Sequence, residues 1–518
     1  MAQGVCKRSV GRLRAAPETR QRMAGSRPAL RVEEVEGRGL GVVSARAVRA
    51  GQVLLEEEPL LLLRGEAGGT PQCQALERAS GFDAGMWAAY LACAARSEED
   101  LAEVCALHAP LESEKALLWR ELLGAAEPLV REILPRFDAA LFLRTNLAIN
   151  FNCFGCQLPK PDGSGPGDFV GFALFRLACR MNHSCCPNAS CQTQSSSGTL
   201  VARALRDIAA GEEICTTYLG AEALLAPVYE RQMRLHAQYE FLCQCSRCTA
   251  GYDDVSVFPC IRPRCQGSVH LKTASHDVEG PAATPCSACG RAPTDEAVLA
   301  FARREAELQE ALTAGASVAD GSVDLQPLHP QHHLTRQVAE LRYEACLRAG
   351  DRGGLLAAAR LAERSWKPLA RAPCRLWAAG RECLADALLL PPHAGAASPT
   401  ALDVTVGQLR EAHRHFQVAL RAICIGHGPG SPYAKALRRK LESTRAALKT
   451  RTPVSSTSGR RLCSFCGWRN LPGWSRECRL CRHAAPPRRG RSHAGAVLRI
   501  WTGRRALLRS RIVERRKK

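Results

Sequence analysis

The side chains best suited to chemistry in this chain lie in two short segments that are far apart in sequence. The first is NHSCCPN at residues 182–188, and the second is CQCSRC at residues 243–248. Four thiolates form a closed tetrahedral zinc site, so one cysteine of the first segment and three of the second are enough to bind one ion. Such an ion would clamp the two segments together beside Tyr218, which lies between them in sequence.

Two further groups of four cysteines have spacings typical of metal sites. The first group lies in a loop-rich segment: Cys260, Cys265, Cys286 and Cys289. The second consists of two C-x2-C pairs: Cys463, Cys466, Cys478 and Cys481. The segment around this second group is too short to build a hydrophobic core, so a metal ion is the obvious source of its folding free energy.

The cysteine content as a whole indicates zinc and a reducing compartment. The chain contains 26 cysteines, many of them in C-x-C or C-x2-C spacings, and no secretory signal peptide is evident. This combination favours metal binding over disulfide bonds. Cys153 and Cys156 have no obvious partner pair, so we expect them to contribute to packing instead.

The formal net charge of +21 belongs largely to the C-terminal end. Residues 451–518 contain 19 Lys and Arg but only two Glu, so the remainder of the chain is close to balanced. A basic tail predicts nuclear import or contact with an acidic partner or nucleic acid, and a merely solvated, disordered end is the alternative. Residues 1–30 are Arg-rich and contain one acid, Glu18, which fits a disordered leader or an organelle transit peptide.

Hydrophobic periodicity predicts the elements that position these residues. We expect a small β-meander before residue 64, a helical region up to residue 145, and short strands and loops from Asn146 to Tyr218. We expect a helix leading into the second cysteine segment, and long helices resembling tetratricopeptide repeats towards residue 450. No apolar run reaches the roughly 18 residues of a membrane span.

These motifs resemble those of the SET-domain protein methyltransferases, and more narrowly the SET-and-MYND (SMYD-type) family. The resemblance covers about residues 31–450 and includes GRGL at 37–40, Asn182-His183, and GEEI at 211–214 followed by Tyr218. One part of the family pattern is missing or degenerate. A MYND finger needs seven cysteines and one histidine, whereas residues 64–92 contain only Cys73.

The resemblance implies a division of the chain and an α+β fold class. The SET β-core would carry a helical insert, a Cys-rich zinc-binding post-SET region, a C-terminal TPR-like helical domain and a small terminal zinc finger. The implied segments are a leader (1–30), the first part of SET (31–64), the insert (65–145), core SET (146–220), post-SET with the second cysteine quartet (221–295), the TPR-like domain (296–450), a linker (451–461), the finger (462–482) and the basic tail (483–518).

The resemblance also implies the roles of individual residues. Tyr218 would be catalytic, and Cys185 would join Cys243, Cys245 and Cys248 on zinc. The residues that would bind S-adenosylmethionine are Gly37, Arg38, Gly39, Leu40, Asn152, Asn182, His183, Tyr218 and Phe241. Asn150 lies two positions from Asn152 and is the alternative for that contact.

The implied activity is transfer of a methyl group from S-adenosylmethionine to a lysine side chain of a protein, histone or non-histone, in the cytoplasm and nucleus. The alternative hypothesis is a SET-fold adaptor without catalysis, which binds protein partners or RNA through its helices, finger and tail. The terminal quartet, with Asn470 and Trp474, resembles a Ran-binding-protein-type finger, which implies ubiquitin or RNA contact. That family has tryptophan where this chain has Leu462.

Overall fold

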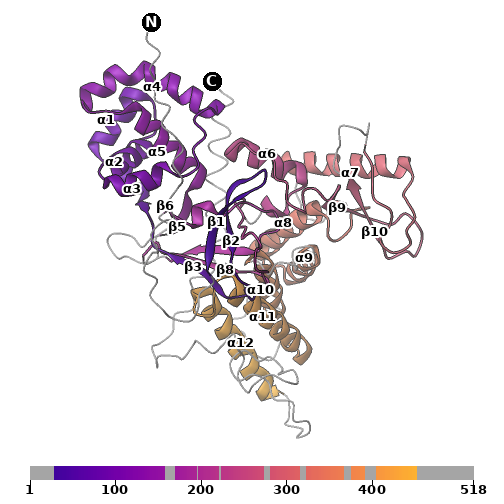
Figure 1. Ribbon diagram of the computed structural model, residues 1–518. Helices are drawn as coiled ribbons and strands as arrows, with labels where there is room; N and C mark the ends of the chain where they lie inside the picture. Colours follow the sequence, from indigo (N-terminus) through magenta and orange to yellow (C-terminus); the bar gives the residue numbers. More distant parts are fainter. Residues whose placement is uncertain are drawn as a thin grey trace.

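The protein is described by a computed structural model (Figure 1) that covers residues 29–157, 170–194, 197–220, 223–272, 281–315, 323–366, 375–390 and 404–451. The quartet Cys463, Cys466, Cys478 and Cys481 lies outside the described residues, as do the predicted basic tail and almost all of the leader and linker. The architecture below concerns the described part of the chain.

Ten strands form the β part of the described structure, in four small antiparallel sheets ordered β1-β2, β3-β8-β7, β4-β6-β5 and β9-β10. Their bounds are β1 (Leu30–Val35), β2 (Gly39–Ser44), β3 (Val53–Glu57), β4 (Leu61–Leu63), β5 (Phe154–Gln157), β6 (Val170–Leu174), β7 (Ala189–Thr193), β8 (Leu200–Ala204), β9 (Tyr252–Pro259) and β10 (Ser268–Lys272).

The α part consists of one helical group between β4 and β5 and a second that follows β10, with α6 between β8 and β9. The helices are α1 (Pro71–Ser80), α2 (Ala84–Ala94), α3 (Glu98–Cys105), α4 (Glu114–Ile133), α5 (Ala139–Asn152), α6 (Val228–Tyr239), α7 (Asp295–Thr313), α8 (His333–Ala349), α9 (Arg352–Ser365), α10 (Arg375–Leu389), α11 (Val406–Gly426) and α12 (Pro432–Arg451). Short 3₁₀ turns occur at Gly65–Gly69, Ala178–Arg180 and Ala223–Leu225.

The expected β-meander before residue 64 is wrong. Only β1 and β2 pair with each other, as a hairpin in which Val35 faces Gly39, whereas β3 pairs with β8 and β4 with β6. The partners of β3 and β4 lie more than a hundred residues away in the chain, and alternation of apolar residues predicts a strand without naming its partner. The buried faces of β2, β3, β7 and β8 share one apolar cluster.

The helical region begins as the periodicity predicts but extends beyond residue 145. Residues 146–152, expected as strand and loop, continue α5. Asparagine is a poor helix former because its side chain competes for backbone groups. Here that competition is harmless, since Asn146 donates to the Phe142 carbonyl (3.0 Å) and Asn152 to the Ala148 carbonyl (2.7 Å), both one turn back. The buried Leu147, Ala148 and Phe151 hold the segment against β4 and α2.

The first helical group and the last helices lie on different sides of the strands, as Figure 1 shows. An aromatic cluster that includes Trp87, Tyr90, Phe137 and Phe142 fills the core of the first group. The last helices pack around Phe416 and Ile423 of α11, which are fully buried. No helix in the described residues is long and apolar enough to cross a lipid bilayer.

The last helices meet the β3-β8-β7 sheet where the α11–α12 turn approaches β8. Gly428 in that turn has a φ of +84°, and a Cβ built on it would lie 2.7 Å from the Arg203 guanidinium. Arg203 itself donates to the Gly51 carbonyl (3.1 Å). A residue without a side chain is therefore needed both for the backbone conformation and for this approach.

We predict that Gly428→Ala lowers the free energy of unfolding by about 1–2 kcal/mol, because alanine in the left-handed region is strained. The measurement is chemical or thermal unfolding followed by circular dichroism. Gly430→Ala is the matched control, since a Cβ there meets nothing within 4 Å and its φ is not positive. Equal stabilities of the two variants would contradict the prediction.

Candidate functional site

The site is built where two segments of irregular chain pair in parallel. His183 forms an isolated parallel bridge with Thr216. The Ser184 N–H donates to the Thr216 carbonyl (2.8 Å), and the Thr216 N–H donates to the Asn182 carbonyl (3.0 Å). This pairing places Tyr218 next to His183, and the Tyr218 N–H donates to His183 Nδ1 (3.0 Å).

Asn188 locks the same two segments together a few residues further on. Its side-chain oxygen accepts from the Cys215 N–H (2.8 Å), and its side-chain nitrogen donates to the Glu213 carbonyl (2.8 Å). The Asn188 N–H also donates to the Cys215 carbonyl (3.1 Å). Asn188 is almost completely buried, so these bonds satisfy groups that water does not reach.

Arg38 connects the β1–β2 turn to this paired region. Gly37 and Gly39, on either side of Arg38, both have positive φ. These two backbone conformations form the tight β1–β2 turn that holds Arg38. The Arg38 guanidinium donates to Glu213 Oε2 (2.5 Å) and to the His183 carbonyl (2.5 Å). Arg38 thus lies directly against the Asn182-His183 step, as the family resemblance implies for two cofactor-binding segments.

The orientation of the Asn182 amide follows from its neighbours. The Asn182 side-chain nitrogen donates to Glu213 Oε1 (2.8 Å) and to the Leu40 carbonyl (3.3 Å). Both N–H groups are therefore used by protein acceptors, and the side-chain oxygen is the atom left to accept a hydrogen bond. An ammonium group suits that oxygen, and a carboxylate suits the remaining Nε–H group of Arg38, whose Nη1 and Nη2 already bond Glu213, His183 and Cys215.

Tyr218 lies in a cluster of aromatic rings. Its ring centroid is 4.9 Å from Tyr239, 5.5 Å from His183 and 6.3 Å from Phe241. The Tyr218 hydroxyl donates to the Met181 carbonyl (3.0 Å), which belongs to the residue before the Asn-His step. Burial raises the pKa of the Tyr218 hydroxyl far above neutral, so the group remains a protonated donor.

Tyr239 was missed by the sequence reasoning, although it stands two residues before Phe241 at the end of α6. The clue available in sequence was the pair of aromatics in YEF at residues 239–241, directly ahead of the cysteine segment. Glu213 was also missed as a site residue. Its link to Arg38 crosses 175 residues of chain, which no local pattern predicts.

The first cysteine quartet has the arrangement of a closed zinc site. The thiols of Cys185, Cys243, Cys245 and Cys248 lie within 4.8 Å of one another and could hold one metal ion. The Cys185 and Cys248 sulfurs are 3.5 Å apart, far longer than a disulfide bond. Four ligands of this kind match tetrahedral Zn²⁺ coordination with no open position, as in structural rather than catalytic sites.

Two groups around the quartet fit a negatively charged zinc–thiolate centre. Arg231 is fully buried, and its guanidinium lies 3.7 Å from Cys248 Sγ while donating to the Ala226 carbonyl (2.6 Å). A buried arginine needs a nearby counter-charge, which four thiolates on a divalent ion supply. His183 accepts from Tyr218 through Nδ1, so its proton is on Nε2, 3.3 Å from Cys185 Sγ.

His183 therefore connects Cys185 of the first cysteine quartet to the segment that carries Tyr218. Burial lowers the pKa of His183 to about 4, which keeps the ring neutral with the single tautomer just described. A ring N–H pointing at a ligand sulfur is a typical interaction around metal sites, where it orients the ligand. Loss of the metal would thus disturb the position of Tyr218 through one imidazole.

The second quartet, Cys260, Cys265, Cys286 and Cys289, also converges and could hold a metal ion. Cys260 and Cys289 sulfurs are 3.7 Å apart, and Cys265 and Cys286 sulfurs are 3.6 Å apart. Backbone N–H groups of Arg262 and Ala288 point at the Cys260 and Cys286 sulfurs. Cys153 and Cys156 belong to no such group among the described residues, in agreement with a packing role.

A third cluster, Glu305 with His332 and His333, has a geometry better explained by hydrogen bonds than by a metal ion. His332 Nδ1 accepts from the Leu334 N–H (3.1 Å), so its proton is on Nε2, 3.5 Å from Glu305. That tautomer presents no lone pair to an ion on the Glu305 side. The hydrogen bonds to the carboxylate come from His333 Nε2 (2.7 Å) and the Ser256 hydroxyl (2.7 Å), whereas the buried His332 Nε2 makes none in the described structure.

The Asn152 side chain does not join the Asn182 network. Its amide donates to the carbonyls of His108 and Ala148, both at 2.7 Å. The neighbouring Asn150 has a buried side-chain nitrogen with no hydrogen-bond partner in the described structure. The implied cofactor contact at Asn152 therefore stays a prediction, and Asn150 stays its alternative.

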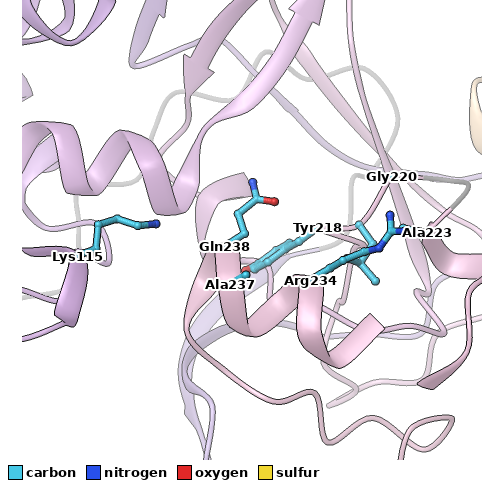
Figure 2. Close-up of a pocket in the computed structure, with 8 residues that line it drawn as sticks. Lys115, Tyr218, Gly220, Ala223, Arg234, Ala237 and Gln238 are labelled. Carbon is cyan, nitrogen blue, oxygen red and sulfur yellow. The ribbon is translucent and has the colours of Figure 1, made fainter. Parts of the chain in front are cut away.

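A pocket of about 440 Å³ opens on Tyr218 from the outside. Figure 2 shows the Tyr218 ring beside Arg234 and Ala237 of α6, with Lys115 of α4 across the opening. The Arg38 turn and the Asn182-His183 step do not line this pocket. Tyr218 thus lines the outer pocket and also contacts the Asn182-His183 step, which lies outside that pocket.

With this geometry in place, comparison with known proteins is informative. Residues 39–219 match the family model described as "SET domain". The chain contains a SET domain. Its paired segments, the Arg38 turn and Tyr218 all fall within the matched range or at its edge.

Curated relatives match the SET domain over a shorter stretch. The protein-lysine N-trimethyltransferase SMYD5 of Danio rerio is 36% identical over 104 residues, which is 20% of this chain and 25% of the relative. The N-lysine methyltransferase SMYD2 of Homo sapiens is 42% identical over 99 residues, which is 19% of this chain and 21% of the relative. The match thus spans about a quarter of the length of these relatives.

Solved structures show a weaker similarity. The SET domain of LSMT bound to lysine and AdoHcy is 14% identical and covers 83% of this chain and 89% of that chain, with a TM-score of 0.25. A TM-score of this size carries no argument about this chain.

We predict that Cys185→Ser lowers the zinc content of the purified protein by one equivalent, because three thiolates no longer close the tetrahedral site. The measurement is metal analysis by mass spectrometry. Cys186→Ser is the matched control, since Cys186 is an exposed neighbour outside the quartet. Unchanged zinc in Cys185→Ser, or equal loss in both variants, would contradict the assignment.

Proposed function

We propose that this chain is a protein-lysine N-methyltransferase that uses S-adenosylmethionine. The observation that carries the proposal is the position of Tyr218, whose hydroxyl is fixed on the Met181 carbonyl beside Asn182-His183 and which also lines the outer pocket. The SET domain match and the lysine methyltransferase relatives support the same conclusion.

The residues of the paired region fit the amino-acid end of the methyl donor. The Nε–H group of Arg38 remains for a carboxylate, and the Asn182 side-chain oxygen is left to accept from an ammonium. Phe241 lies 6.0 Å from the His183 ring and is placed to cover a flat heterocycle. When bound, S-adenosylmethionine supplies an electrophilic methyl group on a positively charged sulfur.

The aromatic cluster and the pocket serve the acceptor lysine. Transfer of a methyl group to an amine is an in-line displacement, so alignment of the two reactants is the main requirement. The amine must arrive uncharged, although the pKa of a free lysine is about 10.4. The rings of Tyr218 and Tyr239 would remove water from the amine and so lower that pKa.

The Tyr218 hydroxyl and the Met181 carbonyl would then orient the reacting groups. Oxygen atoms next to a methyl group on a cationic sulfur make weak C–H···O contacts, which guide the methyl along the line of attack. Neither oxygen needs to take or give a proton in the transfer step. A protonated Tyr218, held by its raised pKa, meets this requirement at all physiological pH values.

The finer features of the chain belong to the same proposal. We propose that residues 221–295 form a zinc-binding post-SET region and that the later helices form a TPR-like domain for protein partners. Their convergent cysteine quartets and packed antiparallel helices support these two assignments. We further propose that the protein occurs in both cytoplasm and nucleus.

The alternative is a SET-fold adaptor without catalysis. An adaptor needs neither Arg38 and Asn182 bound to the same Glu213 carboxylate nor a pocket-lining tyrosine whose hydroxyl is fixed beside the Asn182-His183 step. These features favour the enzyme.

We predict that Tyr218→Phe lowers methyl transfer from labelled S-adenosylmethionine about a hundredfold, the cost typical of small misplacement of reacting groups. Binding of S-adenosylhomocysteine, measured by calorimetry, should stay close to that of the unmodified protein, since the phenyl ring remains. Tyr252→Phe is the control, because that residue lies in β9 against His270. Equal labelling by both variants, or no labelling by the unmodified protein despite cofactor binding, would favour the adaptor.

A further inference from the structure

In the proposed function, the outer pocket is the route by which the target lysine would reach Tyr218. Its described lining comes from α4, from the segment that follows Tyr218 and from α6. The β1–β2 turn, which holds the donor end in the proposed function, contributes no lining residue. In the proposed function, the residues that line this pocket, drawn in Figure 2, would therefore face the substrate protein rather than the cofactor.

Both charged residues in the described lining are cationic: Lys115 of α4 and Arg234 of α6. The Lys115 ammonium lies 5.1 Å from the centre of the Phe151 ring, a cation–π contact that keeps the side chain near the opening. The two residues come from opposite walls, so a peptide entering between α4 and α6 passes both.

Arg234 has one acidic neighbour, and this neighbour does not cancel its charge. Glu230 lies one turn back on α6 with 3.4 Å between the charged atoms, and both side chains are well exposed to solvent. An exposed pair of this kind is weak and easily exchanged for another carboxylate. Lys115 lies over an aromatic ring and forms no ion pair in the part of the chain that the structure describes.

We infer that this pocket selects lysines flanked by acidic residues, with Lys115 and Arg234 as the residues that determine the specificity. The inference rests on the proposed function and narrows its substrate class. Complementary charge at the rim of an interface favours one class of partner and disfavours the opposite class. Lysine-rich and arginine-rich segments such as histone tails would be repelled by the same two cations.

The same charges favour the chemistry. An ammonium that enters between two cations is disfavoured relative to the neutral amine, which is the form that accepts a methyl group. An acidic neighbour in the substrate would remain at the rim and pair with Lys115 or Arg234. Selection of the substrate and deprotonation of its lysine therefore require the same two side chains.

The test compares three sets of lysine peptides that differ only in the flanking residues: acidic, neutral or basic. Transfer of labelled methyl groups by the full-length protein is measured as kcat/KM for each set. We expect the acidic set to be preferred over the neutral set by about threefold to fivefold for each charge, and the preference to weaken at high salt. Arg234→Glu and Lys115→Glu should each reduce or reverse it.

Arg131→Glu is the matched control. Arg131 is a cation on the same helix as Lys115 but about 24 Å further along it, paired with Glu127 and outside the pocket lining. It should leave the preference unchanged. Binding of S-adenosylhomocysteine should be the same in all variants, because Lys115 and Arg234 face the acceptor.

Two results would overturn the inference while leaving the proposed function intact. The first is equal or better transfer to the basic set by the unmodified protein. The second is weakened S-adenosylhomocysteine binding in Arg234→Glu, which would place Arg234 on the donor side. A different result would overturn the proposed function and the preference with it. In that result, the protein binds S-adenosylhomocysteine but methylates none of the peptide sets and no protein.

Discussion

The parallel pairing of Asn182–Ser184 with Thr216 is the constraint on which the site depends. Two hydrogen bonds across this pairing, together with the three bonds of Asn188, hold irregular chain segments that belong to no regular sheet. Backbone groups buried in such a place must find partners, and several of these partners are on the other segment. The bonds that satisfy the backbone are thus the same bonds that bring Tyr218 to His183.

From this pairing, the contacts continue in two directions, through the Glu213 carboxylate on one side and the first cysteine quartet on the other. Towards the β1–β2 turn, Glu213 ties Arg38 and Asn182 into one network. Towards α6, His183 faces Cys185, and the buried Arg231 faces Cys248. A neutral imidazole with a defined tautomer lies between the Arg38–Glu213–Asn182 network and the first cysteine quartet, so His183 contacts both. These contacts explain how a segment without regular secondary structure can hold its side chains in fixed positions.

Much of the site was visible in sequence because its members stand in short motifs. The cysteine spacings predicted both described quartets, and the structure brings each of them together. The family resemblance implied that the GRGL turn and the Asn-His step bind the same cofactor, and the structure places Arg38 against the His183 carbonyl. The sequence did not predict the partners of β3 and β4, the extent of α5 or the role of Glu213. Each of these depends on residues more than one element away.

By itself, the sequence determined which residues are able to hold a metal, donate to a carboxylate or line a helix, since these are properties of side-chain types and local spacing. Only the tertiary structure decided which of these residues meet. In the fold, the Asn152 side chain bonds to the first helical group, and hydrogen bonds hold the Glu305–histidine cluster. Lys115 lies opposite Arg234 at one pocket. The physical reason is that contacts between distant segments are selected by burial and hydrogen-bond satisfaction over the whole fold, which local patterns do not record.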